Sequence, residues 1–512
     1  MKKNQIIILT TFYFFMATIT NLAGQDSISR GIYFSKKEYK ATPLPDFNKI
    51  KKDIPIPQIS DKYLIDMYWF CWELAFNKLK VPLPKSPFVS NYIDEAFCPN
   101  IFQWDTHFMI MFWKYVHTIF PAIESQDNFY RCQHADGYIC REIKEADGTD
   151  FYYGGKDNTI NPPLYPWVEW DYYTISEDDS RFKMVLPVLE KYADWLNENR
   201  VKKGTKHGLY WQTSLGSGMD NSPRSGSGWT DMSAQMTMFY KYLSMMAVHV
   251  GMADKGKIYK VKADEIAKKI NQYMWNEQDG LYYDLDDNGL QIKSKTVASF
   301  WTMLAGIANK HQAELMLKNL QDPKEFWRTI PFPTLSADDT VYHPRGQYWQ
   351  GGVWAPTNYM IIKGLEDYGY YDFANKASLK YLEGMGEVFK KTHTVWENYS
   401  PDSLMEGNLA AKNFVGWTGL GPIALLIESV IGIKSDGLNN TINWHITRTD
   451  LHGVENLKIK DNSITLLCKE RKAVTDKAFI TITATKPFTL IIHKNNSTNT
   501  FQIKSGNNTI EI

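Results

Sequence analysis

Apolar residues recur at spacings of three and four along nine separate segments of this chain. That spacing is the period of an α-helix with one buried face, and several of the segments are apolar on almost every side. The segments are residues 63–79, 104–120, 181–199, 229–250, 255–274, 296–308, 353–368, 371–390 and 417–431. The gaps leave room for about three weaker helices, so the pattern predicts a mainly α fold.

The connections between these helices are long and rich in Gly, Pro, Trp and Asp; residues 204–228, for example, include six glycines. Helical hairpins that close into a ring place such loops together at one end of a rigid scaffold. An open helical solenoid is the alternative, but the sequence has no repeat at the roughly 34- to 47-residue periods of those folds. We therefore expect a helical toroid over residues 59–433.

Short segments with alternating β-branched residues replace the helical pattern after Ile433. This alternation between Asn, Asp and Gly turns is typical of an antiparallel β-sandwich, which we expect over residues 434–512. We interpret it as a packing domain, and the alternative is a sugar-binding module. Four prolines interrupt residues 25–58, which we expect to form an extended lead-in.

The first residues have the pattern of a secretory signal peptide. Lys2 and Lys3 precede an apolar run over residues 6–20, and small residues end at Gly24. We expect cleavage after residues 1–24, no membrane span in the mature chain, and a periplasmic or secreted location. An uncleaved anchor is the alternative. No cysteine lies near the cleavage point, so a lipid anchor is not indicated.

Composition excludes some partners and favours another. Basic and acidic residues both number 57, so the chain has no basic excess for nucleic acid. Aromatic residues make up 14% of the chain, with 17 Trp and 30 Tyr, and these side chains stack on sugars as well as filling cores. The five cysteines have no metal-binding spacing, although Cys132 and Cys140 are close enough in sequence to pair. We predict no metal centre. The sequence contains no recognisable Ca²⁺-ligand loop, and whether a structural Ca²⁺ ion binds is left open.

Hydrolysis of a glycosidic bond requires two carboxyl groups, which need not be close in sequence. The first candidate is Asp220, within the small-residue stretch Leu215-Gly-Ser-Gly-Met-Asp-Asn-Ser-Pro-Arg224. Glycines there allow a ligand to approach the backbone closely. Arg224 is placed to orient that carboxyl group or to bind a sugar hydroxyl. The alternative is that Asp220 only caps a turn before Ser-Pro.

The second candidate is Glu397, within His393-Thr-Val-Trp-Glu-Asn-Tyr-Ser-Pro-Asp402. Trp396 and Tyr399 flank it, a setting that fits a solvated charge poorly. Glu406 is the main alternative for this role, and Asp402 is a weaker one.

Three further clusters resemble a sugar-binding floor. One opens a predicted helix with Trp104 and Asp105, and the second is the rigid turn Asn161-Pro-Pro-Leu-Tyr165. The third, over residues 345–356, contributes Gln347, Trp349 and Trp354. The structural alternatives are a helix cap for Asp105 and core packing for Trp104.

Taken in order, these motifs resemble a clan of inverting α-glycosidases. The clan holds glycoside hydrolase family 63 (processing α-glucosidases and bacterial relatives, including mannosylglycerate hydrolases) and the family 37 trehalases. The likeness covers residues 95–432. It rests on Trp104-Asp105, Asn161-Pro-Pro163, Gly218-Met-Asp220 with Arg224, the Trp349 and Trp354 loop, Trp396-Glu-Asn-Tyr399 and Gly416-Trp417-Thr-Gly419.

The resemblance implies an (α/α)6 barrel without an organic cofactor, with Asp220 as general acid and Glu397 as general base. It also implies that Trp104, Asp105, Arg224, Trp349 and Trp354 line the subsite of the sugar that is cleaved off. The chain departs from the clan in three ways: it lacks the large N-terminal β-domain of many family 63 members, it lacks complete trehalase motifs, and it has Asn161 where Gln is common. Trehalose is therefore not favoured as the substrate.

We therefore predict an exported inverting α-glycosidase that removes terminal α-linked glucose or mannose from an oligosaccharide or small glycoside. A polysaccharide lyase on a helical toroid and a non-catalytic carbohydrate-binding protein are the alternatives.

Overall fold

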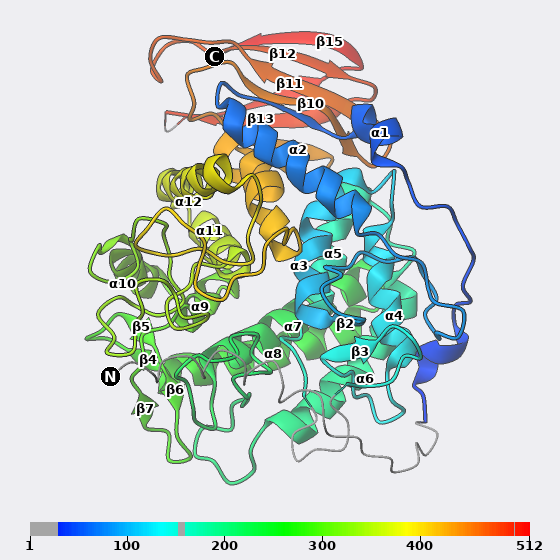
Figure 1. The fold of residues 1–512 in the computed structure, drawn as a ribbon, viewed down its shortest axis with the longest axis vertical. Coiled ribbons are helices and arrows are strands. Elements are labelled where there is room, and N and C mark those ends of the chain that lie inside the picture. Colours follow the sequence, from blue (N-terminus) through cyan, green and yellow to red (C-terminus); the bar gives the residue numbers. More distant parts are fainter. Residues whose placement is uncertain (1–28, 152–158, 496) are drawn as a thin grey trace, which may run out of the picture.

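The computed structural model describes residues 29–151, 159–495 and 497–512, and the predicted signal peptide lies outside them. The chain is mainly helical, as predicted, with a sheet-rich C-terminal region at one end of the molecule (Figure 1). The α-helices are α1 (Phe47–Ile50), α2 (Lys62–Asn77), α3 (Gln103–Trp113), α4 (Ser125–Cys132), α5 (Tyr165–Ser176), α6 (Phe182–Arg200), α7 (Thr230–His249), α8 (Ala253–Tyr273), α9 (Trp301–Leu304), α10 (Lys310–Gln321), α11 (Ala355–Asp367) and α12 (Tyr371–Thr392).

Shorter or wider helical turns extend several of these helices. They are the 3-10 turns η1 (Ile32–Ser35), η2 (Lys51–Asp53), η3 (Lys114–Val116), η4 (Ala122–Glu124), η5 (Val297–Phe300), η6 (Trp417–Leu420) and η8 (Gly437–Asn439), and the π-helix η7 (Gly421–Ile431). The predictions of regular α-helices over residues 296–308 and 417–431 are therefore wrong in detail. In the second segment Pro422 lacks an N–H, and Gly419 lies so close to Phe112 of α3 that a β-carbon would be 2.6 Å from its ring.

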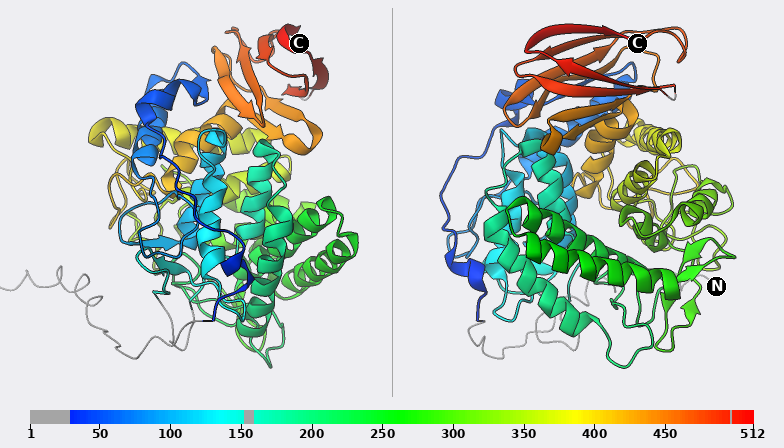
Figure 2. Two further views of the ribbon diagram at one scale, coloured as in Figure 1. Left: turned by 90° about the vertical axis from the view of Figure 1, so that its right-hand side faces the viewer. Right: turned by 180° about the vertical axis from the view of Figure 1, so that it is seen from behind.

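Contacts between helices form a closed cycle. Helix α3 contacts α5, α5 contacts α7, α7 contacts α9, α9 contacts α11, α11 contacts η6, and η6 contacts α3. Other helices pack outside this cycle, among them α8 against α7 and α2 against α12 (Figures 1 and 2). Every residue of α3 is buried, and its sequence is apolar from Phe108 to Trp113, whereas its first turns bury the polar residues Gln103, Asp105, Thr106 and His107.

A network of buried charges joins α3, α5 and α11 of the cycle, near their C-terminal ends, to η7, which continues η6. Lys114, just after α3, lies 3.0 Å from both Asp171 of α5 and Glu428 of η7. Lys363 of α11 lies 2.7 Å from the other oxygen of Glu428. Burial alone would raise the pKa of Glu428, but the charges of Lys114 and Lys363 outweigh it and hold that pKa well below its usual range. Because each helix contributes from its C-terminal half, the four run in the same direction.

Two sheets pack face to face beyond these C-terminal ends. Their strands are β1 (Ile56–Gln58), β8 (Ile433–Asp436), β9 (Thr441–His445), β10 (His452–Ile459), β11 (Asn462–Cys468), β12 (Phe479–Ala484), β13 (Phe488–Lys494), β14 (Ser497–Ile503) and β15 (Gly506–Glu511). The strand orders are β1-β10-β11-β12-β15 and β14-β13-β9-β8. Short two-stranded pairs, β2 (Asn100–Phe102) with β3 (Glu142–Lys144), β4 (Trp275–Asn276) with β5 (Leu281–Tyr282) and β6 (Asp284–Leu285) with β7 (Gln291–Ile292), lie within the helical region.

The expectation of a wholly antiparallel sandwich is wrong at one pair. Strand β13 runs parallel to β9, with Leu490 opposite Ile442. The chain reaches β13 from β12, which belongs to the other sheet, so β13 enters beside β9 by a crossover rather than a hairpin.

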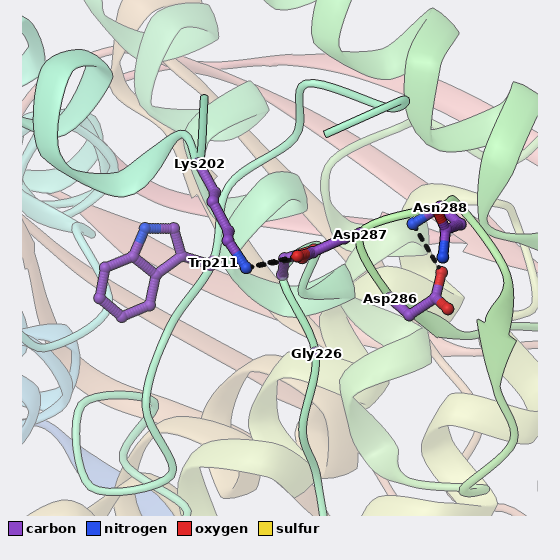
Figure 3. Close-up of a pocket in the computed structure, with 7 residues that line it drawn as sticks. Lys202, Trp211, Gly226, Asp286, Asp287 and Asn288 are labelled. Carbon is purple, nitrogen blue, oxygen red and sulfur yellow. Dashed lines mark hydrogen bonds and ion pairs between the residues drawn. The ribbon is translucent and has the colours of Figure 1, made fainter. Parts of the chain in front are cut away.

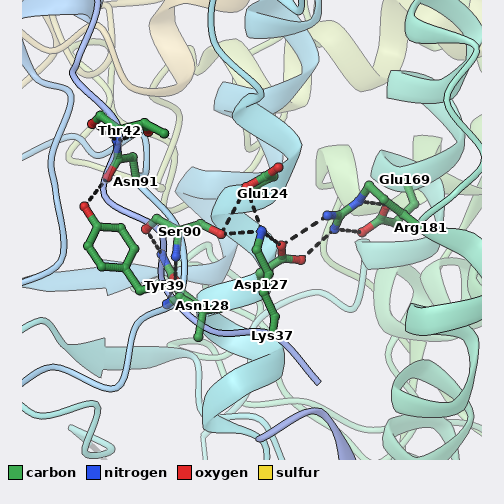
Figure 4. A network of polar contacts seen from close by, with 11 residues as sticks. Lys37, Tyr39, Thr42, Ser90, Asn91, Glu124, Asp127, Asn128, Glu169 and Arg181 are labelled. Carbon is green, nitrogen blue, oxygen red and sulfur yellow. Dashed lines mark hydrogen bonds and ion pairs between the residues drawn. The ribbon is translucent and has the colours of Figure 1, made fainter. Parts of the chain in front are cut away.

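The lead-in is tied to both regions and is not extended throughout, since η1 and α1 interrupt it. Near its start, Lys37 lies 2.6 Å from Glu124 and 2.7 Å from Asp127 (Figure 4). Arg181 then joins Asp127 to Glu169 of α5. At its end, β1 adds an edge strand to the C-terminal sheet.

No helix of the described residues is long and apolar enough to cross a membrane. The five cysteines are free thiols, so Cys132 and Cys140 do not form a disulfide.

We predict that Glu428→Gln lowers the free energy of unfolding by about 3 kcal/mol at pH 7, because two buried ammonium groups lose a shared counter-charge. The pKa of Glu428 is lowered on folding, so its contribution is fully present above its unfolded pKa of about 4.3 and is lost progressively as the pH falls from there toward the much lower folded pKa. Urea unfolding of the wild type and the variant measures the difference at pH 7, and repeating it at pH values below 4 follows its loss. Asp461→Asn is the control, since that exposed partner of Lys486 is expected to contribute nothing measurable. Equal effects of the two variants would contradict the prediction.

Candidate active site

We call the helices of the closed cycle the inner helices. The predicted site residues lie in the first turn of these helices or in the loops before them, at the end opposite the buried charge network. Trp104 and Asp105 begin α3, and the other motifs lie just before α5, α7, α11 and η6. Helix N-termini carry unpaired N–H groups and a partial positive charge, so this end of the cycle favours acidic side chains and polar ligands.

The loop that carries Asp220 is packed on Trp104. Gly218 has a φ of +77°, and a β-carbon there would be 3.0 Å from the indole ring. Asn161 joins the two segments: its side-chain oxygen accepts from the backbone N–H of Trp104 at 3.4 Å, and its amide donates to the carbonyl of Gly216 at 3.5 Å. The structure thus brings Trp104, Asn161 and the Asp220 loop together.

Arg224 anchors the end of this loop. Its guanidinium pairs with Asp231 at 2.6 Å and with Asp284 at 2.8 Å, and it lies over the ring of Trp229. The side chain is only 1% exposed. These contacts attach the Asp220 loop to Asp231 at the start of α7 and to Asp284 of β6.

Asn221 connects the Asp220 loop to the Trp-rich loop before α11. Its side-chain oxygen accepts from the N–H of Trp349 at 2.8 Å, and its amide donates to the carbonyl of Gln347 at 2.9 Å. In that second loop Trp349 and Trp354 stack with ring centroids 3.8 Å apart, and Trp417 lies 5.6 Å from Trp354.

Glu397 is held on three sides. The phenol of Tyr348 donates to one carboxylate oxygen at 3.1 Å, and the N–H of Ala411 donates to the other at 3.0 Å. The indole N–H of Trp417 donates to its backbone carbonyl at 3.0 Å. Burial raises the pKa of Glu397 to about 7, although the two donors to its carboxylate oppose the rise.

The carboxyl groups of Asp105, Asp220 and Glu397 influence one another's charge. The charge of Asp220 adds to the rise in the pKa of Glu397, and that of Glu397 adds to the rise at Asp105. Burial raises the pKa of Asp220 as well, while the positive charge of Arg141 opposes it. One oxygen of Asp105 is buried without a hydrogen-bond partner among the described residues. This part of the molecule can hold and transfer protons near neutral pH.

Three predicted side chains are engaged elsewhere. Glu406 is 4.0 Å from Arg345 and partly exposed, and the indole N–H of Trp396 donates to Thr392 at the end of α12. The side chain of Gln347 accepts from Asn408. Asp402, the weaker alternative to Glu397, pairs with Arg328 at 2.7 Å.

Sequence reasoning missed Tyr348, Asn221 and Arg141 as site residues. Tyr348 reaches Glu397 because both it and Gln347 adopt positive φ, +67° and +38°, which a sequence pattern does not reveal. Asn221 follows Asp220 directly, and an Asn beside a candidate carboxylate in a glycine-rich loop was the one usable signal.

A separate hollow of about 690 Å³ lies beside the Asp220 loop (Figure 3). It is lined by Lys202, Trp211, Gly226, Ser227, Asp286, Asp287 and Asn288. Lys202 and Asp287 pair across it at 2.6 Å, so their charges cancel, and it shares no residue with the carboxyl cluster. Within the described ranges, no group of three or more His, Cys, Asp or Glu side chains is arranged to hold a metal ion.

Comparison with known proteins gives one family match. The sequence model of the mannosylglycerate hydrolase MGH1-like glycoside hydrolase domain matches residues 99–414. A protein of Borreliella burgdorferi described as uncharacterized is 27% identical over 82% of this chain and 91% of its own length. The probable mannosyl-oligosaccharide glucosidase of Schizosaccharomyces pombe is 22% identical over 46% of this chain and 33% of its own length.

A solved structure, the family 63 mannosylglycerate hydrolase of Thermus thermophilus in complex with glucose, shares the fold. Its TM-score is 0.55 at 19% identity, covering 70% of this chain and 99% of that one. The resemblance read from the motifs is confirmed.

We predict that Arg224→Met destabilises the protein by about 3–5 kcal/mol, because Asp231 and Asp284 would stay buried without their counter-charge. Thermal and urea unfolding measure the loss. Arg345→Met is the matched control, since that guanidinium is 46% exposed and its ion pair with Glu406 is long, at 4.0 Å. A stable Arg224→Met protein would show that the ion pairs do not hold the loop.

Proposed function

Because the chain belongs to the mannosylglycerate hydrolase MGH1-like glycoside hydrolase family, we propose that it is an exported inverting α-glycosidase with Asp220 as general acid and Glu397 as general base. The substrate class we propose is an oligosaccharide or small glycoside with a terminal α-linked glucose or mannose. The relatives named as a mannosylglycerate hydrolase and as a probable mannosyl-oligosaccharide glucosidase support these two sugars. The basic and apolar start of the chain supports export.

The observation that carries this proposal is the set of contacts that joins the loops of the two carboxyl groups. Asn221, directly after Asp220, accepts from the N–H of Trp349 and donates to the carbonyl of Gln347, and Tyr348 between them donates to Glu397. Burial is the main cause of the raised pKa of Glu397, and the charge of Asp220 adds to it, so the two carboxyl groups lie in one region. Two carboxyl groups in one region are what acid–base hydrolysis requires.

The hydrogen bonds suggest which group holds the proton. Tyr348 and Ala411 both donate to Glu397, and donors stabilise an ionised carboxylate. Burial raises the pKa of Asp220, and among the described residues its carboxyl group accepts only from its own backbone, so we propose that Asp220 is the group that enters the reaction protonated. Asp220 would then protonate the leaving oxygen while Glu397 takes a proton from a water molecule that attacks the anomeric carbon from the opposite face.

The remaining assignments follow the same proposal. The closed cycle of inner helices with helices outside it supports an (α/α)6 barrel. Trp104, Asp105, Trp349, Trp354 and Trp417 are proposed to line the subsite of the cleaved sugar. For Arg224, the two ion pairs favour positioning of the Asp220 loop over direct sugar contact.

We predict that Asp220→Asn and Glu397→Gln each lower kcat by about 10³-fold without a comparable loss of stability, because each removes one proton-transfer group. The assay is hydrolysis of a panel of α-linked glucosides and mannosides, with the product anomer followed by NMR from the first turnover. Inversion is expected. Glu387→Gln, an exposed change on α12, is the control and should retain wild-type activity.

Other outcomes of this assay identify the alternatives. Retention of configuration would exclude a water molecule between the two carboxyl groups. Products that absorb in the ultraviolet through a new double bond would indicate a lyase. Sugar binding without turnover in the wild-type protein would indicate a non-catalytic binding protein.

We predict that Tyr348→Phe shifts the acidic limb of the kcat/KM–pH profile upward by about 0.5–1 unit. The phenol stabilises ionised Glu397, so its loss raises the pKa of Glu397 further above its usual range, and the base becomes protonated at higher pH. Tyr39→Phe, which removes a hydrogen bond to Asn91 in the lead-in, is the control. An unchanged limb would mean that Glu397 is not the base that titrates there.

A further inference from the structure

An exposed aromatic ring lies at the edge of the site. Phe97 is 57% exposed, although its ring stacks on that of Phe102 at 5.2 Å with an angle of 21°. Its other neighbour is Phe414, at 6.1 Å. We call Phe97 and Phe102 the aromatic platform.

The backbone presents Phe97 outward at a cost. Ala96 has a φ of +60°, a left-handed conformation that alanine rarely adopts. The preceding residue, Glu95, is buried and accepts from Lys78 and from the N–H of Gly416. The chain is therefore fixed just before the ring, and the exposed ring and strained residue bring no evident gain in folding.

The platform is continuous with both halves of the site. On one side, Phe102 pairs with Glu142 across β2 and β3, and the guanidinium of Arg141 lies 5.8 Å from its ring. Arg141 and Glu142 are close enough to Asp220 for their charges to interact with it. On the other side, Phe414 lies 4.7 Å from Trp417, which donates to the backbone of Glu397.

From this placement we infer that the aromatic platform binds the leaving group of the substrate, and that this leaving group is itself a sugar ring. The inference rests on the proposed function, because a general acid at Asp220 faces the leaving oxygen. Flat aromatic rings stack on the C–H face of a pyranose, and the exposed ring of Phe97, supported from behind by Phe102, is suited to hold the departing sugar. The substrate class is then an α-linked disaccharide or longer oligosaccharide rather than a glycoside of a small aglycone.

Two substrates that differ only in the leaving group test this inference. One is an α-linked disaccharide that the wild-type protein cleaves, and the other is the α-glycosyl fluoride of the same terminal sugar, which has no leaving ring. For Phe97→Ala we expect kcat/KM on the disaccharide to fall by about fivefold or more, mainly through KM, and kcat/KM on the fluoride to stay within about twofold. Phe97→Leu keeps apolar packing on Phe102 and should show the same selective loss, whereas Phe97→Trp should restore disaccharide turnover.

Phe479→Ala removes another exposed ring, 44% exposed on β12 of the sandwich, and should change neither rate. Equal losses of kcat/KM on both substrates would assign Phe97 a structural role. No loss on either substrate would mean that the aromatic platform does not bind the leaving group. Either result overturns the inference but leaves the proposed hydrolase activity intact. Failure of the wild-type protein to cleave any α-linked disaccharide or fluoride would overturn the proposed function and this inference together.

Discussion

The buried ion pairs of Lys114, Asp171, Lys363 and Glu428 connect four helical segments at one end of the helical region. A charge removed from water needs a partner, so each of these residues depends on the others for its place in the core. They join the end of α3 to α5, α11 and η7 near the C-terminal ends of these helices. The loops of the candidate site lie toward the N-terminal ends of the same helices.

The pKa values of buried carboxyl groups shift in opposite directions at the two ends of the helical region. At the C-terminal end lysines surround Glu428, and its pKa lies well below the usual range. At the N-terminal end Glu397 receives two neutral hydrogen-bond donors, and its pKa rises to about 7. Burial raises the pKa of Asp105 well above its usual range, and nearby carboxylates raise it further. Lysines therefore keep the acid at one end ionised, whereas burial raises the pKa values of the acids at the other end.

Periodicity was enough to predict most of the helices, because a helix with one buried face repeats its apolar residues every three or four positions. The motifs around Asp220 and Glu397 could be located for a similar reason, since glycines and tryptophans beside a carboxylate are rarely needed for folding alone. Tyr348 could not be found, because its role depends on two consecutive left-handed residues. The parallel pairing of β13 with β9 was missed because strand direction depends on which sheet the chain has just left. The 3-10 turn η6 lies close against α3 at Gly419, and η7 packs on α12 at Gly421, contacts that no single segment encodes.

The lead-in strand β1 has a consequence for the order in which the chain acquires its structure. Gln58 is hydrogen-bonded to Glu455, 397 positions further along the sequence. A ribosome or translocation pore releases the first of these residues long before the second, so the edge of the C-terminal sheet cannot be completed during synthesis. Contacts of such long sequence separation form slowly. Until β1 docks, β10 is an unpaired edge strand that can pair with a neighbouring chain.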